Sequence, residues 1–232
     1  MALGASSMIR RYGRRAAVRR ALFGFGLYLI PIALPAAIPG PRAAEPVRLL
    51  MLGDSITAGY GLDHAEALPR RLEALLREAG AAVTVVDAGV SGDTTAGGRS
   101  RLDWALADDP QAVIVALGGN DGLRGVPPAE TYANLSDILA RLKARGLPVL
   151  LAGMLAPPNL GADYGREFSE TFQRLAREYP EAVFYPFLLD GVAGEPSLNQ
   201  PDRIHPNARG AEEVARRMLP AVRRLLSKVQ GG

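Results

Sequence analysis

A serine in the first third of the chain and a histidine near its end carry the chemistry that this sequence suggests most directly. Ser55 follows an apolar run at residues 47–52 and so comes just after an expected strand. A serine hydroxyl becomes a nucleophile when a base removes its proton and an acid orients that base. The chain has only two histidines, His64 and His205, and only His205 has an acid, Asp202, three residues before it. The pattern predicts nucleophilic catalysis by Ser55, with His205 as base and Asp202 as orienting acid.

Each of these residues also has a simpler interpretation. Ser55 alone could cap a helix, and His205 alone could lie in a surface turn. Asp54 is an alternative acid partner, but we expect it to be structural, because its side chain should point away from that of Ser55 at the end of a strand. We expect His64 to be a solvated loop residue. The combination of a serine after a strand with an Asp-x-x-His spacing favours catalysis over these separate roles.

Two further polar motifs follow apolar runs in the middle of the chain. Gly92 lies in the first, where a glycine lets the backbone come close to a ligand with its N–H free. Asn120 lies in the second, and its side-chain amide is an uncharged donor suited to a developing oxyanion. The simpler alternatives are a turn leading to a helix capped by Asp93 or Thr94, and a glycine-rich turn with Asn120 in a left-handed conformation. The motif around Asn120 lacks the lysine and hydroxyl residue of a P-loop, which argues against nucleotide binding.

Apolar strand patterns and amphipathic helix patterns alternate five times along the chain. We expect strands at 48–52, 83–86, 112–117, 148–153 and 183–186, and helices at 65–79, 95–107, 127–145, 164–179 and 207–229. Such alternation predicts parallel strands joined by crossover helices, and strands that are apolar throughout require a sheet covered on both faces. Ligands bind such sheets beyond the carboxyl ends of the strands, where Ser55, Gly92, Asn120 and Met154 all fall.

These motifs together resemble the SGNH, or GDSL-type, hydrolase superfamily, in particular its bacterial thioesterase I, lysophospholipase and arylesterase branch. The four residues that give the superfamily its name correspond here to Ser55, Gly92, Asn120 and His205, and their blocks occur in order between about residues 47 and 225. The G-x-S-x-G elbow of the common α/β-hydrolases is absent, so the nucleophile must sit in a different turn.

Two positions depart from the usual pattern of that superfamily. Ile56 stands in place of the leucine of the Gly-Asp-Ser-Leu signature, which is a conservative change. Arg203 stands in place of a glycine often found between the acid and the histidine. The second change alters the rim of the site but leaves the Asp202–His205 spacing intact.

The resemblance implies an α/β fold: a flavodoxin-like three-layer sandwich with a five-stranded parallel sheet and helices on both faces. It also implies that Asp202 and His205 act as a catalytic pair, and that the oxyanion is held by Gly92, Asn120 and the backbone N–H of Ser55. Such a mechanism needs no cofactor and no metal. The loop after the fourth strand is expected to line the acyl pocket, with a plain crossover loop as the alternative; its residues are Met154, Leu155, Ala156, Pro157 and Pro158.

The predicted activity is hydrolysis of carboxylic esters and of thioesters, with a small acyl ester, acyl thioester or lysophospholipid as substrate. One alternative is a carbohydrate or cell-wall O-deacetylase that uses the same three residues, although the single tryptophan, Trp104, argues against an aromatic sugar groove. The other alternative is a non-catalytic, membrane-tethered binding protein, which would predict a damaged triad.

The distribution of charge and the lack of cysteine exclude several other classes. All seven basic residues before Glu45 are arginines, and no acid precedes that position. The remainder holds 20 basic and 24 acidic residues, a net charge near −4, so we expect no nucleic-acid partner. Without cysteine there is no disulfide framework, and two histidines disfavour a zinc site. Residues 45–232 are expected to form one domain that acts as a monomer.

The first 44 residues have the layout of a targeting segment. Arginines are concentrated between residues 10 and 20, and residues 21–40 carry no charge. A basic start followed by an apolar run is typical of a secretory signal peptide, with small residues before Glu45 as a cleavage point. We therefore expect export to the periplasm. The alternative is an uncleaved inner-membrane anchor at residues 21–40, with the domain facing the periplasm.

Overall fold

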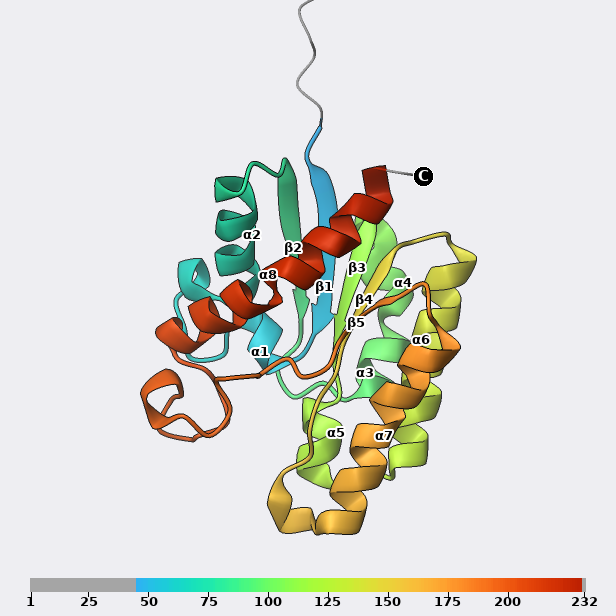
Figure 1. Cartoon of the computed structure of the whole chain (residues 1–232), viewed down its shortest axis with the longest axis vertical. Coiled ribbons are helices and arrows are strands. Elements are labelled where there is room, and N and C mark those ends of the chain that lie inside the picture. Colours follow the sequence, from blue (N-terminus) through green and yellow to red (C-terminus); the bar gives the residue numbers. More distant parts are fainter. Residues whose placement is uncertain (1–44, 231–232) are drawn as a thin grey trace, which may run out of the picture. The chain divides into compact units, whose positions relative to one another are not determined.

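The computed structural model describes residues 45–230, so the expected leader at 1–44 lies outside the described residues. The described chain forms a five-stranded sheet flanked by helices (Figure 1). Its strands are β1 Val47–Gly53, β2 Val83–Gly89, β3 Ala112–Ala116, β4 Val149–Ala152 and β5 Val183–Tyr185. The helices are α1 Ser55–Ala58, α2 Leu68–Glu78, α3 Thr95–Ser100, α4 Leu102–Ala105, α5 Gly119–Arg124, α6 Pro128–Ala144, α7 Ala162–Glu178 and α8 Ala208–Gln230.

The strands are all parallel and follow the order β2-β1-β3-β4-β5. This is the flavodoxin-like order, in which successive strands are added on one side of β1 and then on the other. A crevice forms between β1 and β3 at the carboxyl ends of the strands, where this order reverses. The α/β expectation is confirmed. In the sheet, Gly53 lies opposite both Gly89 and Ala116, so β1, β2 and β3 end level with one another. The segments that leave these three strands therefore emerge side by side.

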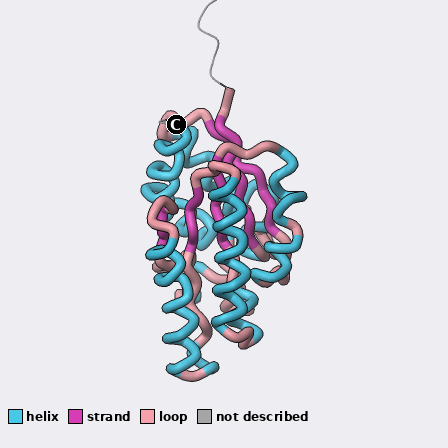
Figure 2. Tube along the Cα trace, turned by 90° about the vertical axis from the view of Figure 1, so that its right-hand side faces the viewer, coloured by secondary structure: helices cyan, strands magenta, loops and turns pink. Residues whose placement is uncertain are grey.

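The helices form a layer on each face of the sheet (Figures 1 and 2). Helices α2 and α8 pack against each other on one face, and α3, α4, α6 and α7 cover the other. The central strands are buried on both sides: β3 is buried throughout, and residues 49–52 of β1 have no exposed surface. Phe168 and Phe172 of α7 are the largest fully buried side chains in the described part of the chain. Burial on both faces explains why these strands are uniformly apolar in sequence.

The prediction of one continuous helix at 95–107 is wrong, because three short helical segments replace it. Helices α3 and α4 meet at Arg101, and a turn of 3-10 helix at Leu106–Asp108 follows. Gly97 and Gly98 weaken the first segment. Arg101 also turns back to pair with Asp93 at 2.6 Å. Similarly, the helix expected at 65–79 begins only at α2, after a 3-10 turn at His64–Glu66.

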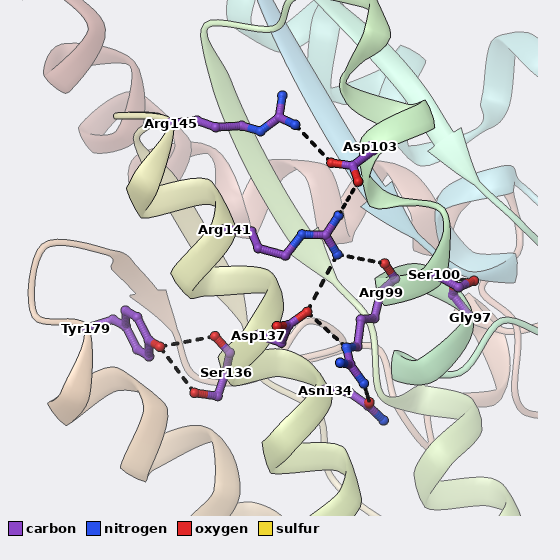
Figure 3. A network of polar contacts seen from close by, with 10 residues as sticks. All are labelled: Gly97, Arg99, Ser100, Asp103, Asn134, Ser136, Asp137, Arg141, Arg145 and Tyr179. Carbon is purple, nitrogen blue, oxygen red and sulfur yellow. Dashed lines mark hydrogen bonds and ion pairs between the residues drawn. The ribbon is translucent and has the colours of Figure 1, made fainter.

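A surface network of arginines and carboxylates joins α3 and α4 to α6 (Figure 3). Arg141 pairs with Asp103 at 2.7 Å and with Asp137 at 3.6 Å, and Arg99 pairs with Asp137 at 2.9 Å. Arg145 adds a second contact to Asp103 at 2.9 Å. Exposed pairs contribute little individually, but a shared network fixes how neighbouring helices lie. None of the helices within residues 45–230 is both long and apolar enough to cross a membrane.

Candidate active site

Ser55 is the first residue of α1, in the tight turn that leaves β1. The turn needs a glycine at position 53, since a Cβ there would overlap Thr57. Asp54 caps the helix: its Oδ1 accepts a hydrogen bond from Ile56 N at 3.0 Å. The Ser55 side chain is largely buried. Strand, glycine and cap together hold the hydroxyl at the carboxyl edge of the sheet.

His205 reaches Ser55 from a loop 150 positions further along the chain. Its Nε2 lies 2.9 Å from Ser55 Oγ, and its Nδ1 lies 2.7 Å from Asp202 Oδ2. The other Asp202 oxygen, Oδ1, accepts from the backbone N–H groups of Ile204 at 2.9 Å and His205 at 3.0 Å. The structure therefore brings Ser55, which follows the first strand, together with the Asp202–His205 pair in one hydrogen-bonded chain.

The pKa of Asp202 reflects these contacts. Partial burial acts to raise it, but the hydrogen bonds from the His205 ring and from the His205 and Ile204 N–H groups outweigh burial and lower the pKa of Asp202 to about 2. Asp202 is thus a carboxylate across the neutral range. A carboxylate on Nδ1 leaves Nε2 free to accept the proton of Ser55 and stabilises the imidazolium that results.

Hydrogen bonds hold both ends of the loop that carries His205. Asn199 and Pro206 form an antiparallel bridge, and Gln200 N donates to His205 O at 2.8 Å. Gln200 Nε2 donates to Tyr60 O at 2.7 Å, which ties the loop to the segment after α1. The Tyr60 ring lies against the His205 ring with 4.6 Å between their centroids. These contacts fix the imidazole relative to Ser55.

Gly92 lies in the turn between β2 and α3, with φ +85°. A residue with a Cβ is strained in that region, which accounts for the glycine. Its carbonyl oxygen accepts a hydrogen bond from Arg124 Nη2 at 2.8 Å. Its N–H has no hydrogen-bond partner within the described part of the chain. Thr94 is the N-cap of α3. The turn therefore contains both the helix cap of the simpler interpretation and the available N–H of Gly92.

Asn120 is in the first turn of α5, which the sequence did not predict. The left-handed alternative for Asn120 is wrong, because within residues 45–230 only Asp109 and Arg203 among non-glycine residues have positive φ. The neighbouring Asp121 anchors the helix. It is fully buried and accepts hydrogen bonds from Thr95 N at 2.8 Å, Thr95 Oγ1 at 2.5 Å and Thr131 Oγ1 at 3.3 Å.

Asp54 differs in part from its expected role. It caps α1, as a structural residue would, but it also lines the cavity beside Ser55. Its Oδ2 accepts from Asn120 Nδ2 at 3.4 Å. Burial raises the pKa of Asp54 to about 6, partly offset by the hydrogen bond from Ile56 N–H. Asp202, and not Asp54, is the acid that hydrogen-bonds the His205 ring.

A cavity of about 430 Å³ opens beside Ser55. One wall contains all five residues expected to bind the acyl group, namely Met154, Leu155, Ala156, Pro157 and Pro158. The remaining apolar wall was not predicted from the sequence and comprises Leu123, Phe187, Leu189, Ala193, Gly194 and Ile204, with Arg203 as its cation. Most of these come from the irregular segment before His205, which has no periodic pattern to identify it. A mostly apolar cavity with a few polar groups at one end is typical of a small-molecule site.

His64 takes no part in this cavity and is exposed at the start of a 3-10 turn, as expected for a solvated residue. Within residues 45–230, no group of three or more histidine or acidic side chains is arranged to hold a metal ion.

Residues 51–213 match the GDSL-like Lipase/Acylhydrolase family. The chain belongs to this family. It is 40% identical over 179 residues to esterase TesA of Pseudomonas aeruginosa, covering 77% of this chain and 89% of that protein. It is 39% identical over 187 residues to thioesterase 1/protease 1/lysophospholipase L1 of Escherichia coli K12, covering 78% of this chain and 88% of the relative.

Solved structures agree with the fold described above. The crystal structure of AlinE4, an SGNH-hydrolase family esterase, superposes with a TM-score of 0.67 at 48% sequence identity, covering 80% of this chain and 99% of that one.

Proposed function

We propose that this protein is a serine esterase that hydrolyses carboxylic esters and thioesters of apolar acyl groups. The observation that carries the proposal is the hydrogen-bonded chain from Asp202 through His205 to Ser55 Oγ at the end of an apolar cavity. Membership of the GDSL-like Lipase/Acylhydrolase family and the names of the two relatives support the same class of reaction.

In the first step Ser55 Oγ attacks the carbonyl carbon of the acyl group while His205 Nε2 takes the hydroxyl proton. Negative charge develops on the carbonyl oxygen of the tetrahedral intermediate. The N–H groups of Ser55 and Gly92 and the Asn120 amide donate to that oxygen, where fixed donors contribute most. His205 then returns the proton to the leaving alcohol or thiol as its bond to the carbonyl carbon breaks.

The second step hydrolyses the acyl-enzyme on Ser55. His205 removes a proton from water, the resulting hydroxide attacks the acyl carbon, and the same donors hold the new oxyanion. The bond to Ser55 Oγ breaks, the carboxylic acid leaves, and His205 returns the proton to Ser55. The charge of Asp202 supports the imidazolium in both steps.

The lining of the cavity favours an acyl chain over a sugar. Its walls are aliphatic apart from Phe187, and its polar residues are confined to Asp54, Ser55, Asn120 and Arg203. Carbohydrate sites usually offer aromatic faces for stacking and many hydrogen-bonding groups. The O-deacetylase alternative is therefore less well supported, and the continuous Ser55–His205–Asp202 hydrogen bonding argues against a non-catalytic tethered binding protein.

The proposal is tested by covalent labelling with a fluorophosphonate and by hydrolysis of p-nitrophenyl esters. Ser55→Ala should lose both labelling and hydrolysis and retain the circular dichroism spectrum of the wild type. The matched control is Ser91→Ala, which removes an exposed hydroxyl in the Gly92 turn and should keep both activities. Labelling of Ser55→Ala at the wild-type rate would mean that another residue is the nucleophile.

We further propose that residues 1–44 direct export to the periplasm, because an arginine-rich start precedes an uncharged run of about 20 residues. N-terminal sequencing of protein from the native envelope should begin between about residues 37 and 45. Full-length protein in the membrane fraction would favour the anchor, and full-length cytosolic protein would contradict export.

A further inference from the structure

Arg203 adopts a backbone conformation that its side chain disfavours. Its φ is +61°, and Asp109 is the only other non-glycine residue at positive φ within residues 45–230. Short polar residues such as aspartate tolerate this region, whereas a long side chain costs about 1 kcal/mol there relative to glycine. A glycine would suit the position better. The arginine therefore occupies a strained position, and such positions cluster at functional sites.

Arg203 is a lining residue of the active-site cavity, and its guanidinium has no partner among the described residues. Arg203 lines the same cavity as Ser55 and Asn120, and its side chain is exposed. No hydrogen bond or ion pair engages the guanidinium within the described residues. Two other arginines near the site are occupied: Arg101 pairs with Asp93, and Arg124 donates to a backbone carbonyl. Neither fold stability nor the Asp202–His205 contact accounts for the Arg203 side chain.

The charge of Arg203 contrasts with its surroundings. Arg203 is the one cationic side chain among the described residues that line the cavity, whereas Ile204, Leu189 and Ala193 of the same lining are apolar. Apolar walls exclude water and strengthen a charge-assisted hydrogen bond at their edge. A guanidinium offers paired N–H groups whose spacing matches the two oxygens of a carboxylate or phosphate.

We propose that Arg203 forms an anion-binding subsite of this cavity, so that the preferred substrates are esters carrying a carboxylate or phosphate group. This inference rests on the proposed esterase function and names the substrate class. The anion can belong to the far end of the acyl group or to the alcohol, and both place a negative charge away from the scissile carbonyl.

The kinetic test compares pairs of esters that differ in one anionic group. On the acyl side, p-nitrophenyl hexanoate is paired with mono-p-nitrophenyl adipate. On the alcohol side, monolauroylglycerol is paired with lauroyl-glycerol phosphate. The readout is the preference, defined as kcat/KM for the anionic ester divided by kcat/KM for the neutral one. Arg203→Gln should lower this preference by about tenfold in one pair, the size expected for a hydrogen bond to a charged group, and the pair affected identifies the side that carries the anion.

Three variants separate charge from backbone strain and from net charge. Arg203→Lys keeps the charge and should retain part of the preference. Arg203→Gly relieves the strain but removes the charge, so it should lose the preference as Arg203→Gln does. Arg223→Gln makes the same change in net charge on an exposed part of α8 and should leave the preference unchanged. An equal preference in wild type and Arg203→Gln for both pairs would overturn the subsite.

A binding measurement keeps this inference separate from the proposed function. Calorimetry with hexyl phosphate on Ser55→Ala protein needs no turnover. The Kd should weaken about tenfold when Arg203→Gln is added, and added salt should reduce that difference. Equal affinity in the two proteins, or no binding to either, would overturn the subsite. If the wild type hydrolysed none of the esters but hexyl phosphate still bound in an Arg203-dependent way, the esterase function alone would be overturned.

Discussion

Among residues 45–230, Asp54 makes the single side-chain contact that holds the amide of Asn120. The separation of 3.4 Å between Asn120 Nδ2 and Asp54 Oδ2 describes a long hydrogen bond, which leaves the amide able to turn toward an oxyanion. A donor of this kind acts on the charge of the transition state more than on the bound ester. Asn120 thus affects kcat rather than KM in the proposed mechanism.

Asn120→Ala should lower kcat by about 10²–10³ with little change in KM, because one oxyanion donor is lost. The measurement is a steady-state comparison on a p-nitrophenyl ester. Asn159→Ala is the control, since Asn159 is an exposed asparagine in the 3-10 turn at Pro158–Leu160 and does not line the cavity. A kcat within about twofold of wild type would remove Asn120 from the set of donors.

Local spacing made the central residues predictable. Asp202 and His205 are three positions apart, so their contact follows from one turn of chain. Of the two histidines, only His205 has an acid three residues before it, which singled it out as the proposed base. Asp54 was harder, because alternation along a strand predicts its direction only while the strand continues. The chain turns into α1 at that point, and the carboxylate of Asp54 therefore reaches both Ile56 N and Asn120.

At the scale of elements, α5 connects two of the proposed oxyanion donors. Its first turn carries Asn120 and its last residue, Arg124, donates to Gly92 O at 2.8 Å. Asp121, between them, is anchored to Thr95 and Thr131 from α3 and α6. A short helix can thus set the distance between a side-chain amide and a backbone N–H that come from different strand ends.

Arg124→Met should lower kcat by about tenfold and leave KM nearly unchanged, because the Gly92 turn loses the contact that orients its N–H. This is less than the loss of a donor, since the donor itself remains. Arg124→Lys should recover part of kcat because an ammonium group can still donate to Gly92 O. Unfolding in urea should show little change, since Arg124 is exposed. Equal losses in both variants, or a loss of stability, would contradict a positioning role.

The α5 helix was missed because its glycines are typical of a turn. Gly118 has φ +112° and does form the turn, but the chain becomes helical at the next residue because Asp121 is anchored by tertiary hydrogen bonds. Sequence periodicity cannot detect a six-residue helix whose stability comes from contacts with other elements. The break of the 95–107 region at Arg101 has the same origin, since its ion pair with Asp93 depends on the folded turn.

At the scale of the whole molecule, the fold follows from a strand–helix pattern that is repeated along the sequence. Five apolar strands alternate with amphipathic helices, and this repetition determines a parallel sheet even where single boundaries shift. The segment between β5 and α8 carries no such pattern. It supplies one wall of the cavity, including Phe187, Leu189 and Ala193, and its path depends on fastenings such as the Asn199–Pro206 bridge. The wall that we propose selects the substrate therefore comes from the segment in which sequence patterns are least informative.

Burial of Asp54 links the active site to the stability of the whole domain. Its pKa is about 6 in the folded protein, against a value near 4 for an exposed aspartate. The folded state thus binds a proton that the unfolded state releases between these values. The contribution of Asp54 to stability is fully present below about pH 4, falls as the pH rises, and levels off above about pH 6.

Asp54→Asn should remove this dependence, since the amide does not titrate and can still cap α1. The difference in unfolding free energy, variant minus wild type, should rise by up to about 3 kcal/mol between pH 4 and 6 and then stay constant. Urea unfolding across about pH 4–8 measures it. Asp202→Asn is the contrasting variant: the pKa of Asp202 is lowered to about 2, so its contribution is present above about pH 4 and is lost only as the pH falls below that value. The unfolding free energy of Asp54→Asn minus that of wild type could instead stay constant across this range. Asp54 would then titrate like an exposed aspartate, and the proposed link between the active site and domain stability would be wrong.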